Sequence, residues 1–102
     1  MGILHTVNKS PFEKSSLQSC LRYAKPGSAL LLMEDGVYAA LRGGAFEEPL
    51  KRAAADLSLY CLEPDLKARG FPPERLIDGI RLVDYGGFVD LAVEYDKVQA
   101  WL

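Results

Sequence analysis

Two cysteines are the strongest nucleophiles in this chain, and the position of Cys20 favours chemistry more than that of Cys61. Cys20 lies in the stretch SSLQSCLRYAKPG, whose spacing is helical. At 100° per residue, Leu17, Leu21 and Ala24 form the centre of an apolar stripe, and Cys20 lies about 60 to 70° from its middle. We therefore predict that Cys20 is on the flank of the helix, within reach of solvent or a partner protein. It is the candidate catalytic residue, as a carrier of sulfur, and packing in the core is the alternative.

Cys61 and His5 are predicted to be structural. Cys61 alternates with Leu57 and Leu59 in the stretch LSLYCL, and unpaired cysteine is among the most buried residue types. His5, the only histidine, lies in the middle of the strand-like stretch ILHTV, on the same side as Val7. We expect a buried neutral imidazole that is hydrogen-bonded to the backbone or to a neighbour, with catalysis as the alternative.

Polar residues gather where the predicted strands end, which is where sites form in parallel α/β sheets. They are Asn8, Lys9, Ser10, Glu34, Asp35, Glu63, Asp65, Asp84 and Tyr85. Asp35, Asp65 and Asp84 stand where helices begin, so helix capping is the preferred interpretation and a divalent-cation site is the alternative. The sequence has neither metal-type Cys/His spacing nor a phosphate-binding glycine loop, so no metal and no cofactor are expected.

The elements that position these residues alternate along the chain. Ser10, Pro11 and Glu13 match a capping box with proline at the first helical position, which predicts a helix from Pro11 to about Ala24. Apolar residues with helical spacing near the end predict another helix, followed by a short edge strand in KVQAWL. Four further strands are predicted at 3–7, 28–33, 57–62 and 80–83. Strands alternating with helices indicate a parallel sheet with helices on both faces.

Composition limits the class of protein. The 102 residues suffice for one domain, which we assign to 1–102. The 12 basic residues are dispersed among 14 acidic ones, so direct nucleic-acid binding is disfavoured. No signal peptide is recognisable, and the longest apolar run, ALLLM, is too short for a membrane span. We expect a cytoplasmic protein without membrane association. Its 49% hydrophobic content would be explained by burial against another subunit, and a tightly packed monomeric core is the alternative.

Several stretches together resemble the TusB/DsrH family, and more specifically its DsrH side. They are LHTVNKSP, ALLLMEDGVYAAL, LYCLEPDLKARG, IRLVDYGGFVDL and the terminal AW, in the family's order. The resemblance implies a flavodoxin-like α/β fold of three layers, with a small, mostly parallel sheet of four or five strands and helices on both faces. It also implies the small subunit of a heterohexamer with DsrE/TusD-like and DsrF/TusC-like chains.

Such a complex passes persulfide sulfur to a DsrC/TusE-like acceptor. In the Dsr branch the sulfur belongs to intracellular sulfur oxidation, and in the Tus branch it ends in 2-thiouridine at the tRNA wobble position. The principal relay cysteine of the family is on the DsrE/TusD subunit, in a segment that this chain does not match. Cys20 resembles a cysteine of the DsrH side, so we expect the sulfur-oxidation branch, with Cys20 as an auxiliary persulfide site. The alternatives are a TusB-type subunit in tRNA thiolation and a purely structural subunit.

Overall fold

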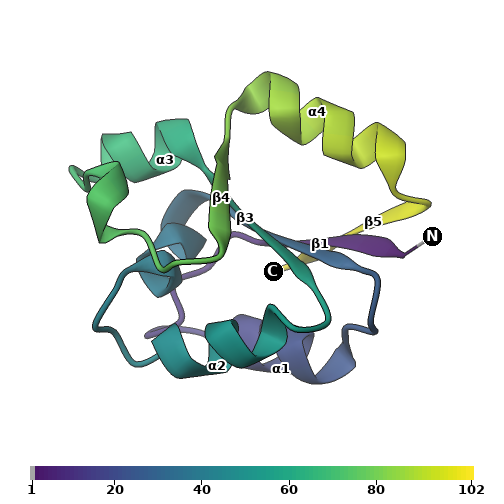
Figure 1. The fold of residues 1–102 in the computed structure, drawn as a ribbon, viewed down its shortest axis with the longest axis horizontal. Coiled ribbons are helices and arrows are strands. Elements are labelled where there is room, and N and C mark those ends of the chain that lie inside the picture. The colour runs from purple at the N-terminus through teal and green to yellow at the C-terminus, as the bar shows by residue number, and fades with distance from the viewer. Residues whose placement is uncertain (1) are drawn as a thin grey trace.

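A five-stranded, all-parallel sheet forms the centre of the computed structural model, which describes residues 2–102 (Figure 1). Along the sheet the strands follow the order β4-β3-β2-β1-β5. The strands are β1 (Ile3–Val7), β2 (Ala29–Leu32), β3 (Ser58–Leu62), β4 (Ile80–Val83) and β5 (Lys97–Trp101). The predicted fold class is confirmed, and the C-terminal stretch is the edge strand beside β1, as the sequence indicates.

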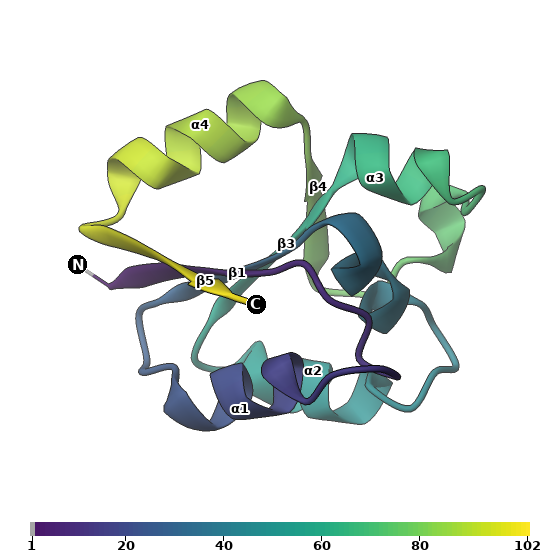
Figure 2. The ribbon, with the colours of Figure 1, turned by 180° about the vertical axis from the view of Figure 1, so that it is seen from behind.

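The helices cover both faces of the sheet. The α-helices are α1 (Ser16–Tyr23), α2 (Glu47–Ala53), α3 (Glu63–Ala68) and α4 (Tyr85–Glu94), and two 3₁₀ helices are η1 (Glu34–Ala40) and η2 (Pro73–Arg75). Figures 1 and 2 show α1 and α2 below the sheet and α4 above it. α4 therefore carries the chain across the sheet from one edge strand, β4, to the other, β5.

Two apolar clusters correspond to the two faces. The larger cluster joins Leu17 and Cys20 of α1 and Leu50 of α2 to one face of the sheet. The smaller cluster places Leu91 of α4 against Leu31 and its neighbours on the other face. β2 is buried along its whole length because both of its faces are covered, which explains why its sequence is continuously apolar.

The first helix is shorter than predicted, since residues 11–14 form a turn and α1 begins only at Ser16. The Ser10 hydroxyl accepts a hydrogen bond from the Phe12 amide at 3.2 Å, and the Ser10 carbonyl accepts from the amides of Glu13 and Lys14. The hydroxyl thus contacts the amide two residues onward, as in a serine turn, and not the one three residues onward that a capping box requires. The predicted capping box is therefore wrong.

Candidate functional site

The carboxyl ends of the strands bring the predicted acidic residues to one edge, where they bind other protein groups. The η1 segment follows β2 here, and the Met33 amide donates to the Val7 carbonyl at 3.0 Å. Glu34 has a positive φ of 49°, and its amide donates to the Asp65 carboxylate at 2.6 Å. Asp65 on α3 therefore satisfies the first amide of the neighbouring 3₁₀ helix. The predicted cap on α3 itself is wrong, because no side chain caps that helix.

Asp35 is paired with an arginine instead of capping a helix. The Arg69 guanidinium donates two hydrogen bonds to one Asp35 carboxylate oxygen, at 2.8 and 3.1 Å, and a third to the Asp65 carbonyl. This charged partner raises the pKa of Arg69. No group of three or more His, Cys, Asp or Glu side chains within residues 2–102 is placed to hold a metal ion. The alternative of an acidic cation site therefore has no support in this geometry.

Asp84 is the helix cap that the sequence predicted. Its carboxylate accepts a hydrogen bond from the Gly87 amide at 2.8 Å, three residues into the turn at the start of α4. This satisfies an amide that has no partner within the helix.

Replacing Asp84 should weaken α4 without disturbing the rest of the sheet. Asp84→Ala is expected to lower the free energy of unfolding by about 1 kcal/mol, because it removes the side-chain acceptor of the Gly87 amide. Asp84→Asn keeps an acceptor oxygen and should lose much less. Urea unfolding followed by circular dichroism measures both. Equal losses in the two variants would contradict capping as the role of Asp84.

Both thiols are buried, so the predicted exposure of Cys20 is wrong. Cys20 and Cys61 are each 0% exposed, and both belong to the larger apolar cluster. Burial raises the pKa of each thiol to about 12, and for Cys61 the nearby Asp65 carboxylate adds to the effect. The predicted core position of Cys61 is confirmed. Neither thiol has the exposure or the lowered pKa that activates a cysteine nucleophile.

His5 is the buried neutral imidazole that the sequence predicted, and its partner comes from the other end of the chain. The Trp101 indole N–H donates to His5 Nδ1 at 3.1 Å, across the β1–β5 pair. Burial lowers the pKa of His5, which keeps the ring neutral. Tyr23 packs edge-on against both rings. No pattern in the sequence identifies Trp101 as the partner, because 96 residues separate the two side chains.

A family model described as "DsrH like protein" matches residues 9–98. The chain belongs to the DsrH family. Among its relatives, Protein TusB of Pectobacterium parmentieri is 41% identical over 97% of this chain and all of the relative. Protein TusB of Escherichia coli K12 is 37% identical over the same shares. The proposed family resemblance is therefore confirmed over almost the entire chain.

Solved structures also match the fold of this DsrH-family chain. The ychN protein of E. coli superimposes with a TM-score of 0.84 at 23% identity, covering 98% of both chains. Protein MTH1491 of Methanobacterium thermoautotrophicum gives a TM-score of 0.73 at 15% identity, covering 95% of this chain and 96% of its own. At these identities the likeness concerns the fold alone.

Proposed function

We propose that this chain is the small, non-catalytic subunit of a TusBCD-type sulfur-relay complex. Two independent features support the proposal. The similarity to proteins named TusB extends over the whole chain, and both cysteines are buried with raised pKa values. The burial of the thiols is the observation that carries the non-catalytic assignment, because a persulfide relay proceeds through an accessible thiolate.

The partners follow from the family. TusD/DsrE-like and TusC/DsrF-like chains would complete a heterohexamer, and a TusE/DsrC-like protein would accept the sulfur. On α4, the apolar side chains Tyr85, Val89 and Val93 recur every four residues and are 60%, 60% and 81% exposed. An exposed apolar stripe of this kind is typical of a surface that is buried against another subunit, which supports membership in a complex. The principal relay cysteine would then belong to the TusD-like partner.

The similarity favours tRNA thiolation as the destination of the sulfur. Cys20 suggested the Dsr branch, but a buried thiol is as well explained by packing and does not distinguish the branches. The relatives named TusB, at 37 to 41% identity over full length, support the Tus branch. We therefore place the chain in the route to 2-thiouridine, with intracellular sulfur oxidation as the alternative.

Complementation tests the function. An E. coli strain that lacks its own TusB should regain 2-thiouridine in its tRNA when it expresses this chain, as measured by mass spectrometry of tRNA nucleosides. Co-purification of the host TusC and TusD with the chain establishes that the complex has formed. Formation of the complex without recovery of 2-thiouridine would overturn the placement in tRNA thiolation.

The same strain separates a structural subunit from a chemical one. The double variant Cys20→Ala, Cys61→Ala should restore 2-thiouridine as well as the unchanged chain does, since neither thiol carries sulfur. If Cys20→Ala alone abolished recovery in an assembled complex, Cys20 would be an auxiliary persulfide site. A gain of about 32 Da on the unchanged chain after incubation with a persulfide donor would agree with that result.

A further inference from the structure

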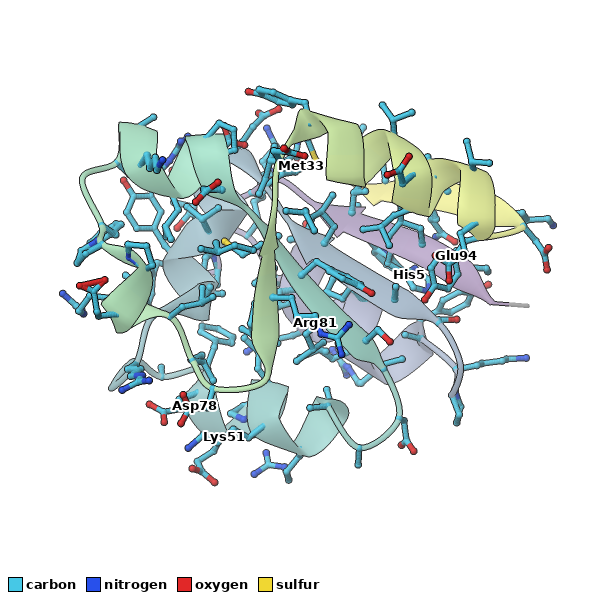
Figure 3. All side chains as sticks on the ribbon, turned by 45° about the horizontal axis from the view of Figure 1, so that its top comes forward. His5, Met33, Lys51, Asp78, Arg81 and Glu94 are labelled. Atoms are coloured by element: carbon cyan, nitrogen blue, oxygen red, sulfur yellow. The ribbon has the colours of Figure 1, made fainter. Side chains whose placement is uncertain are left out.

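A cavity of about 320 Å³ lies at the amino ends of β1 and β2, beside the C-terminal end of α1. His5 lies in its wall, together with Tyr23, Lys25 and Ser28. This is the opposite edge of the sheet from the acidic residues described above. In Figure 3, His5 is labelled toward the N-terminal end of the sheet, well away from Met33 at the carboxyl edge. The volume falls within the range of small-molecule sites in proteins.

The hydrogen bond from Trp101 fixes the proton on the His5 ring. An indole N–H can only donate, so Nδ1, which accepts it at 3.1 Å, carries no proton. The neutral ring must therefore carry its proton on Nε2. Residues 2–102 supply no hydrogen-bond acceptor for this Nε2–H, and His5 lines the cavity. The Nε2–H is therefore available to a ligand that enters the cavity.

The rest of the wall also offers donors. Lys25 supplies a cation, and the Tyr23 hydroxyl can donate. The Ser28 hydroxyl oxygen already accepts from the Ile3 amide at 3.1 Å, which leaves its proton to be donated elsewhere. The lining residues that the structure describes include no carboxylate side chain. A wall of donors and one cation selects a ligand with negative charge and acceptor oxygens.

We propose that this cavity binds a small anion through its oxygen atoms, a carboxylate or an inorganic oxyanion. The His5 Nε2–H donates a hydrogen bond to the anion, and Lys25 supplies the opposite charge. Trp101 is a positioning residue. Its hydrogen bond to Nδ1 keeps that nitrogen unprotonated, so the ring proton is on Nε2. The site is independent of the sulfur-relay proposal, since it uses neither cysteine nor any partner chain.

Two unique side chains make the test direct. His5 is the only histidine and Trp101 the only tryptophan, so ring-labelled ¹⁵N-histidine and tryptophan emission each report on this place alone. The full chain is titrated with sodium sulfate and with sodium acetate, against sodium chloride at matched ionic strength. We expect a saturable shift of the His5 Nε2 signal and a parallel change in Trp101 emission with at least one of the two anions. Saturation with sulfate alone or with acetate alone defines the anion class.

Matched variants distinguish anion binding in the cavity from a nonspecific effect of the chain's charge. Lys25→Gln should weaken the affinity about tenfold, which corresponds to loss of one hydrogen bond to a charged group. Lys9→Gln removes the same charge at the carboxyl end of β1 and should leave the affinity unchanged. The proposal is overturned if neither anion gives a saturable shift, if chloride gives the same shift, or if the two variants lose affinity equally.

Discussion

Both thiols of the folded chain should react with an aromatic disulfide reagent near neutral pH about a thousandfold more slowly than an exposed cysteine. The reason is the fraction of thiolate, which is the reactive form. Burial raises the pKa of both Cys20 and Cys61 from 9.0 to about 12, so three pKa units separate them from a free thiol. Reaction should accelerate as the pH rises, because a larger fraction of each thiol is then deprotonated. Full reaction of both thiols is expected only in denaturant, measured by the absorbance of the released thiolate.

A matched control distinguishes the effect of burial on thiol reactivity from any effect of the helix itself. Gln18→Cys, in a chain whose native cysteines are both changed to alanine, places a thiol on the exposed side of α1, two residues from Cys20. This thiol should react at the rate of a free cysteine. If Cys20 in the folded, unchanged chain reacted as fast, the thiol would be accessible after all, and an auxiliary persulfide at that position would regain support.

Slow reaction would also mean that Cys20 could carry sulfur only after a movement of α1. A persulfide adds a second sulfur atom to a side chain that has no exposed surface and belongs to the close-packed cluster between α1 and the sheet. α1 would have to move away from the sheet for the donor to reach it. The structural-subunit role needs no such movement, which is why it is the simpler reading of this chain.

The pattern around Cys20 correctly predicted that Ser16–Tyr23 is helical, but it misplaced the centre of the buried face. Leu21 and Ala24 are only partly buried, whereas Leu17 and Cys20 are almost completely buried. A helix on a sheet buries a stripe at least about 100° wide, so a residue about 60 to 70° from the estimated centre lies close to the edge of that stripe. A modest rotation of the helix then decides burial. That rotation depends on what α1 packs against, which its own sequence does not contain.

Other features also differ in whether local sequence is enough to predict them. The continuous apolar run of β2 and the alternation of Leu59 and Cys61 in β3 are properties of local sequence, and both strands were predicted. The pairs His5–Trp101 and Glu34–Asp65 join residues 96 and 31 positions apart. They depend on which strands and helices become neighbours in the sheet order, so residue types alone could not have identified them. The cavity beside His5 likewise depends on how α1 packs beside β1 and β2.

Gly36→Ala should be among the most destabilising single changes in the chain, because a methyl group there would collide with backbone. A Cβ at Gly36 would lie 2.2 Å from the Val7 carbonyl oxygen. That oxygen cannot rotate aside as a side chain could, since Val7 is held in β1 and its carbonyl accepts from the Met33 amide at 3.0 Å. The φ of Gly36 is not in the left-handed region, so the cost comes from this contact alone.

We expect Gly36→Ala to lower the free energy of unfolding by about 3 kcal/mol. In a domain of this size that corresponds to a fall of about 12 to 24 °C in Tm, measured by circular dichroism. Gly86→Ala is the control, because its Cβ would come no closer than 3.4 Å to the Asp84 carboxylate. Alanine in α4 should leave Tm unchanged or raise it, since it favours the helix by up to about 1 kcal/mol. If both variants melted within about 2 °C of the unchanged chain, the close approach of η1 to β1 would be wrong. The position of Glu34 beside Asp65 depends on that same approach, so the carboxyl edge would then have to be rebuilt as well.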